Sequence, residues 1–142
     1  MTSSGQLTIN GATINVQSFS AGASNPTTLG PGGIVSGKPS FSSLNVLAST
    51  DASFPVLNEA VGTGHKFPTA TLTFTWSSRH GAPATVTYQL DNVVLESAQQ
   101  SGGGGAPVMS FSLAFERVHW TFTDSSGTTT RGWNLVTNQP LP

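Results

Sequence analysis

The sequence has 142 residues, no cysteine and a formal net charge of −1, and only 8% of its residues are charged. A typical soluble domain carries about 25% charged residues, so other groups must cover the surface here, and serine and threonine supply 19 hydroxyls each. The absence of cysteine excludes disulfides and thiolate metal sites. The few charged residues form no basic stripe that could neutralise phosphates, which argues against nucleic acid as a partner.

The length suits one domain, residues 1–142, which can bury about 68–70% of its unfolded surface in a single core. The first residues, MTSSGQLTIN, contain no basic segment followed by an apolar run. Nowhere do about 18 apolar residues occur in succession. We therefore expect a soluble protein that is made in the cytoplasm, with no classical export signal and no membrane insertion.

The chain begins with extended segments at 6–9 and 13–20, and a glycine-rich connection at 22–39 follows. Within it, Gly32, Gly37 and Lys38 have the spacing of a phosphate-binding loop. Such a loop requires Ser or Thr after the lysine and a helix that begins there. Pro39 occupies that position and provides neither a hydroxyl nor an N–H. We therefore reject nucleotide binding and expect a long connection that is functional or disordered.

The middle of the chain predicts one helix between strands. After an extended segment at 40–47, residues 53–64 read as a short helix with Ser53 as N-cap and Gly62 or Gly64 as terminator. Residues 69–78 alternate threonine with apolar residues, and residues 84–92 alternate in the same way. The two segments predict an antiparallel hairpin with a turn at Arg79, His80 and Gly81.

Two long segments change the parity of their apolar residues midway. In residues 84–95 the parity changes after Asp91 and Asn92. In residues 108–124 it changes at Glu116 and Arg117. A parity change within a strand indicates a bulge or bend, which a sheet needs if it is to curl. A glycine loop at 102–105, a polar loop at Ser125–Thr130 and a strand at 131–137 complete the chain. The predicted fold is all-β and mainly antiparallel: a curled two-sheet β-barrel with one short α-helix across an open end.

Residues with catalytic potential are scattered. His65, His80 and His119 have no carboxylate at metal-ligand spacing, and no nucleophile elbow of the Gly-x-Ser-x-Gly type occurs. Asp91 and Glu96 point to opposite faces of a strand unless a bulge intervenes. We therefore expect no enzymatic activity, no metal and no cofactor. The tryptophans could form a platform for sugars, but core packing explains Trp76 and Trp120 better. For Trp133 the sequence does not decide between sugar binding and core packing.

The order of features in the second half is more specific than any single motif. Two long strands are joined by a Gly/Ser loop and Pro107; the stretch SFSLAF at 110–115 follows, then Arg117, Val118 and Trp120, with GWN at 132–134. This pattern resembles the Hcp family, the hemolysin-coregulated tube proteins of bacterial type VI secretion systems. VGTGHKF, ATLTFTW and GKPSFSSLNV also fall in the family's order, and the resemblance extends from about Gln6 to Asn138.

The resemblance implies a barrel that assembles as a hexameric ring, with rings stacked into the hollow inner tube of a contractile injection machine. The implied partners are copies of the chain itself and the sheath, spike and effector proteins of that machine. The tube would leave the cytoplasm without a signal peptide, for the medium or a target cell, and its lumen would carry effectors. In the family, the long connection after the second strand touches a neighbouring subunit or ring. The contact residues expected here are Leu29, Gly32, Gly33, Ile34, Val35, Ser36, Gly37 and Lys38.

Three alternatives remain open at this point. A phage-like tail-tube protein would share the tube architecture. A monomeric carbohydrate-binding β-sandwich would expose Trp133 or Tyr88 on a concave face. An esterase-like or glycosidase-like enzyme would require a polar pocket that holds a perturbed acid or histidine.

Overall fold

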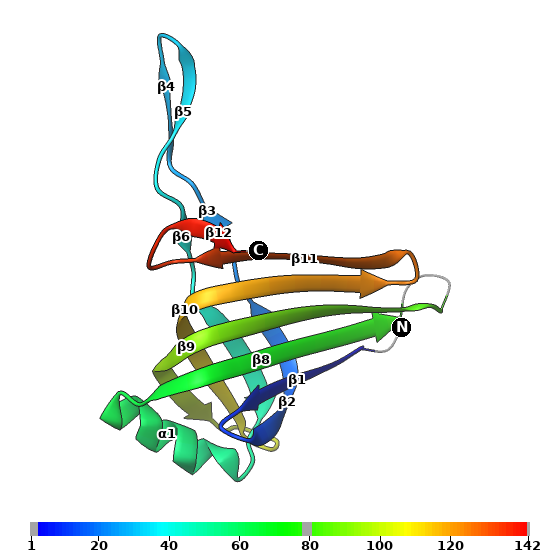
Figure 1. Cartoon of the computed structure of the whole chain (residues 1–142). Coiled ribbons are helices and arrows are strands. Elements are labelled where there is room, and N and C mark those ends of the chain that lie inside the picture. Colours follow the sequence, from blue (N-terminus) through cyan, green and yellow to red (C-terminus); the bar gives the residue numbers. More distant parts are fainter. Residues whose placement is uncertain (1–2, 78–80, 142) are drawn as a thin grey trace.

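The computed structural model describes residues 3–77 and 81–141, which form an antiparallel barrel with one helix and a projecting hairpin (Figure 1). The predicted all-β class with a single short helix is confirmed. The elements are, in chain order, β1 (Ser3–Ile9), β2 (Ala12–Ser20), β3 (Ala23–Ser24), β4 (Thr27–Gly30), β5 (Gly33–Ser36), β6 (Ser40–Phe41), β7 (Leu44–Ser49), α1 (Ser53–Thr63), β8 (Lys66–Ser77), β9 (Pro83–Ser101), β10 (Val108–Asp124), β11 (Gly127–Asn134) and β12 (Gln139–Leu141).

The barrel consists of the strands β10, β7, β2, β1, β8 and β9 in spatial order, and it closes where β9 pairs with β10. Each of these pairings is antiparallel. The strand β10 is shared, since its first half pairs with β7 and its second half pairs with β11. Closure therefore leaves β11 and β12 as an extension of the sheet beside the barrel (Figure 1).

The interior of the barrel is apolar, because strands with a period of two turn one set of side chains inward. Leu44, Leu72 and Leu113 lie in it with no solvent exposure. In the part of the chain that the structure describes, no polar or charged side chain is buried. Burial of one such leucine contributes about 1.5–3 kcal/mol, so packing is the main source of stability in a chain without disulfides.

The helix α1 lies across one end of the barrel (Figure 1), where Leu57 and Ala60 join the core. The predicted C-terminal stop is confirmed, because Gly64 adopts a left-handed conformation with φ 67°. The predicted N-cap is wrong. Ala52 occupies that position without a side-chain hydrogen bond, and Asp51 Oδ1 accepts the Ser53 backbone N–H at 2.8 Å. No helix among residues 3–77 and 81–141 is long and apolar enough to cross a membrane.

A polar cluster holds the bend at which β8, β9 and β10 meet. Asn92 has a φ of 54°, and its side-chain amide donates a hydrogen bond of 2.7 Å to Glu116 Oε2. Lys66 Nζ lies 3.4 Å from Glu116 Oε1, and Arg117 Nε lies 3.7 Å from Asp91 Oδ2. The hydrogen bond from Asn92, and after it the charge of Lys66, lowers the pKa of Glu116 from its ordinary value. Both predicted parity changes thus fall in this cluster.

A second irregularity, which parity did not predict, is a register shift between Ser112 and Leu113. Ser112 pairs with Ser97 while Leu113 pairs with Leu95, so Glu96 is the extra residue on β9. Its carboxylate accepts a hydrogen bond from the Ser43 hydroxyl. A bulge increases local twist, and this one lies where β10 follows the curve of the barrel.

Two predicted loops are strands. The polar segment Ser125–Thr130 is mostly part of β11, and cross-strand hydroxyl contacts link Thr121 to Thr130 and Thr123 to Thr128. The connection 22–39 contains β3, β4 and β5 instead of irregular loop. The hairpin of β8 and β9 is confirmed by its register, Trp76 opposite Ala84. Arg79 and His80 of its predicted turn lie outside the described residues.

Replacement of Gly5 by Ala is expected to destabilise the barrel. A Cβ atom at Gly5 would lie 2.5 Å from the ring of Phe74 and 3.1 Å from the Val16 carbonyl oxygen. Overpacking of this kind costs about 1–3 kcal/mol, and urea unfolding measures it. The control is Gly103→Ala, whose Cβ would meet no atom within 4 Å. Equal stability of the two variants would contradict the close packing of β1 on β8.

Acidification is expected to lower the stability of the wild type more than that of Glu116→Gln. The folded-state pKa of Glu116 is lowered, so the carboxylate stabilises the fold above its unfolded pKa and loses this effect as pH falls through the folded pKa. Glutamine does not titrate. Thermal unfolding at about pH 7 and about pH 3 measures the difference between the two proteins. Parallel losses would exclude a role for Glu116 at the bend.

Candidate functional site

The connection between β2 and β7 forms a hairpin that stands away from the barrel (Figure 1). Strands β4 and β5 pair antiparallel, with Leu29 opposite Ile34 and Thr28 opposite Val35. Pro31 and Gly32 make the turn, and Gly33 follows with a φ of 114°, a value that glycine adopts readily. All eight predicted contact residues therefore lie on β4, on β5 or directly beside them.

Hydrogen bonds within the connection hold the two sides of the hairpin base together. The Gly37 N–H donates to the Pro26 carbonyl oxygen at 2.7 Å and to Asn25 Oδ1 at 2.9 Å. Below this, β3 pairs with β6, and the Gly22 N–H donates to the Ser42 hydroxyl at 2.8 Å. These contacts give a regular structure to a segment that the sequence predicted to be a functional or disordered connection.

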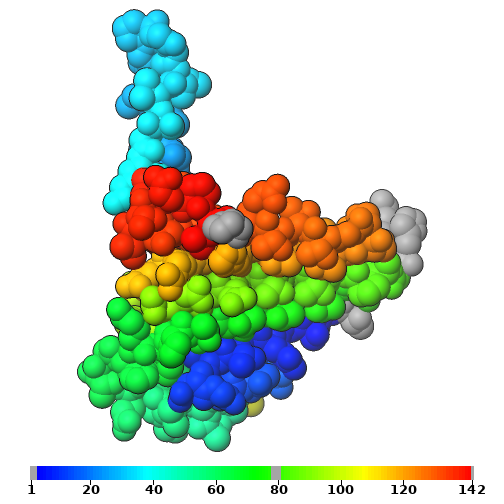
Figure 2. All heavy atoms as spheres, viewed as in Figure 1, coloured from blue at the N-terminus to red at the C-terminus, as the bar shows by residue number. Residues whose placement is uncertain are grey.

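The tip of the hairpin carries large apolar side chains that nothing in the subunit covers. Leu29 is 84% exposed, Ile34 is 76% exposed and Val35 is 58% exposed. In Figure 2 the hairpin is a narrow column that rises from the body of the molecule. A hairpin of two strands is marginally stable alone in water, and a cluster of exposed apolar side chains marks an interaction site. The hairpin is therefore suited to contact another surface.

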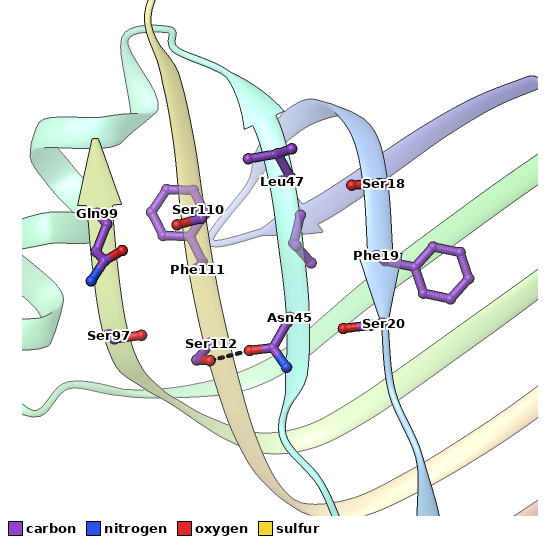
Figure 3. A pocket seen from close by; sticks show the side chains of 11 residues that line it. Ser18, Phe19, Ser20, Asn45, Leu47, Ser97, Gln99, Ser110, Phe111 and Ser112 are labelled. Carbon is purple, nitrogen blue, oxygen red and sulfur yellow. Dashed lines mark hydrogen bonds between the residues drawn. The ribbon is translucent and has the colours of Figure 1, made fainter. Parts of the chain in front are cut away.

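A second feature is a hollow of about 430 Å³ on the outer face of β2, β7, β9 and β10 (Figure 3). No charged residue lines it. The Ser112 hydroxyl donates a hydrogen bond to Asn45 Oδ1, while Leu47 contributes apolar surface. The hydroxyl and amide residues that line the hollow are Ser18, Ser20, Asn45, Ser97, Gln99, Ser110 and Ser112.

The residues considered for catalysis do not form a common site. Asp91 faces Arg117, and Glu96 bonds to Ser43, so the two carboxylates have different partners. Within the described ranges 3–77 and 81–141, no three His, Asp or Glu side chains gather where they could hold a metal ion. His80 lies outside those ranges.

The tryptophans contact other aromatic rings. The Phe41 ring lies 5.7 Å from the Trp120 ring and 5.8 Å from the Trp133 ring. Both tryptophans are half-buried against the core. Trp76 is also half-buried and lies 6.2 Å from Phe122. Core packing is thus confirmed for Trp120, and Trp133 packs there as well.

Sequence reasoning missed two of these features. The hairpin had a local signal, since a Pro-Gly-Gly turn lies between Thr-Thr-Leu and Ile-Val-Ser, and a short turn between such runs is typical of hairpins. The hollow also had a signal, in that serines recur at every second position of 18–20 and 110–112. Its assembly from four strands depends on register, which no single segment contains.

Solved structures with a similar fold include a type six secretion system protein and several Hcp proteins. A structure described as a type six secretion system protein matches with 23% identity and a TM-score of 0.84, over 99% of this chain and 100% of that one. Hcp1 from Salmonella typhimurium matches with 20% identity and a TM-score of 0.80, over 99% and 100%. Secreted protein Hcp3 from Pseudomonas aeruginosa matches with 13% identity and a TM-score of 0.67, over 93% and 96%.

The sequence itself matches a protein family. No curated protein matches the chain, but the family profile described as "Type VI secretion system effector, Hcp" matches residues 5–122. This range contains β2, the hairpin, α1, β8, β9 and most of β10. The matched range and the shared barrel agree with the resemblance found in the sequence, and the chain belongs to the Hcp family of type VI secretion system tube proteins.

Proposed function

We propose that this chain is a structural subunit that assembles into a hexameric ring, and that the rings stack into the hollow tube of a contractile injection machine. The observation that carries the proposal is the projecting hairpin, whose tip exposes Leu29, Ile34 and Val35. A second copy is a suitable cover, because a contact that repeats head to tail closes into a ring or extends into a filament. The hairpin residues 27–37 carry no charge, so repeated copies do not repel one another.

The serine-lined hollow supports a role as the wall of a channel. Its lining has hydroxyl and amide groups and no charge, so it offers hydrogen bonds without strong attraction to any one charged cargo. We propose that this face lines the lumen and that cargo effectors pass along it. Sheath and spike proteins of the machine are further proposed partners, and export to the medium or a target cell through the machine follows from the same role.

Function through contact and shape, without catalysis, fits the absence of a common catalytic site in residues 3–77 and 81–141. A phage-like tail tube would use the same contacts, and the family of the chain favours the secretion tube. A monomeric sugar-binding module has less support, since Trp120 and Trp133 pack on Phe41 and against the core.

The native mass distinguishes a ring subunit from a monomeric module. We expect light scattering after size exclusion to give six times the subunit mass of 14.6 kDa, and negative-stain images of the same fraction to contain annular particles. A monomer at all accessible concentrations would contradict self-assembly and favour the binding module, which sugar-dependent tryptophan fluorescence would then test.

The double variant Ile34→Asp/Val35→Asp is expected to fold but to assemble poorly. Burial of one such side chain contributes about 1.5–3 kcal/mol, so each lost contact weakens association by roughly ten-fold or more. Sedimentation velocity across a concentration series measures assembly, and circular dichroism checks the barrel. The control Ile34→Val/Val35→Ile keeps the tip apolar and is expected to assemble. Unchanged assembly of the aspartate variant would rule out the hairpin as a contact.

A further inference from the structure

The end of the barrel that α1 covers has an apolar groove of its own. Two hollows, of about 320 Å³ and about 200 Å³, lie beside α1 at the turn between β1 and β2. Asn10 and Val56 line both hollows, so the two hollows adjoin at these residues. We call this surface, defined by Ile9, Asn10, Val56, Leu57 and Glu59, the α1 groove.

The α1 groove has an apolar floor and an exposed apolar rim. Ile9 and Leu57 are 1% and 2% exposed and line the larger hollow, whereas Val56 is 54% exposed. No charged residue lines the larger hollow, and Glu59 lines the smaller one. An aliphatic side chain beside Val56 would remove apolar surface from water without burying a charge. The larger hollow of the groove therefore suits an uncharged, apolar side chain.

The hairpin tip is uncharged and apolar, as the groove requires, but a subunit cannot reach its own α1 groove with its own hairpin. The hairpin rises from the end of the molecule opposite α1, and the whole barrel lies between them (Figure 1). The described residues include six exposed large apolar side chains, of which three are on the hairpin and one is Val56. The two surfaces lie at opposite ends of one molecule, so two copies can bring them together.

We propose that the hairpin tip of one copy docks in the α1 groove of the next copy. This inference rests on the proposed self-assembly and specifies its contact. Leu29 and Ile34, which lie side by side across β4 and β5, cover Val56. The hairpin residues 27–37 carry no charge, so docking of the tip beside Val56 buries no charge of the hairpin.

The contact is heterologous, since each copy contributes a hairpin at one end and a groove at the other. Such a contact repeats from copy to copy, and every hairpin finds a groove once the rotation closes. A tip-to-tip contact would instead pair copies and stop at a dimer. The two geometries therefore predict different covalent products when the contact is cross-linked.

Engineered cysteines test the contact directly, because the chain has no cysteine of its own. The assembled double variant Ile34→Cys/Val56→Cys is oxidised and run on a denaturing gel without reductant. A disulfide forms only if the two Cα atoms lie within about 7 Å. We expect a ladder of covalent dimers, trimers and larger species that the controls lack, because only docked pairs satisfy that limit. Reductant should collapse the ladder to monomer.

Two controls make the result specific. Ile34→Cys alone should give no ladder, and covalent dimers from it would indicate tip-to-tip contact and overturn the proposal. Ile34→Cys/Ser125→Cys moves the second thiol to an exposed position in the turn after β10, and a ladder from this pair would mean that cross-linking is unspecific.

Light scattering of each reduced sample separates the docking site from self-assembly. If the wild type and the variants are all monomers, the proposed self-assembly is wrong, and the proposed docking of the hairpin in the α1 groove is wrong as well. If they assemble and the 34/56 pair still gives no ladder, the docking site alone is wrong.

Discussion

The pairing of β9 with β10 is the constraint on which the rest of this structure depends. These strands have 19 and 17 residues, and their ladder runs from Ser101 opposite Val108 to Thr85 opposite Thr123. Strands of this length can close a barrel only if they bend. The bend is supplied by the left-handed Asn92 and by the register shift at Ser112, and Glu116 fixes it from the facing strand.

Closure also decides how copies of the chain can meet. An open sheet exposes unpaired backbone groups at its edges, and other chains add to them easily. In the eight-stranded sheet, β9 returns to pair with β10, and an edge stays open at β12, which has three residues, and at residues 127–131 of β11, which pair with β10 alone. Side-chain surfaces offer a further contact, since the exposed apolar residues of the hairpin and of α1 lie at opposite ends of the barrel.

The sequence predicted what a single segment encodes. Alternation in TATLTFTW gave the strand and its inward face, parity changes gave the bends, and Gly64 gave the end of the helix. Features that depend on a distant partner escaped. The bulge at Glu96 arises from pairing with β10, and the serine-lined hollow requires four strands in register. Ser53 failed as N-cap because Asp51 provides the acceptor instead. GWN at 132–134 lies beyond the range that matches the family profile.

The few charged residues of the chain are unevenly placed, and several of them lie at the bend of the barrel. Eleven residues of the chain are charged, and four of them, Lys66, Asp91, Glu116 and Arg117, are held in ion pairs at the bend. The charge that remains is thus spread over a surface dominated by hydroxyls. A surface of this kind has little electrostatic resistance to meeting its own copy, so specificity must come from shape and apolar contact. In the proposed assembly, the projecting hairpin and the α1 groove supply both, and the hollow, which no charged residue lines, is the channel wall.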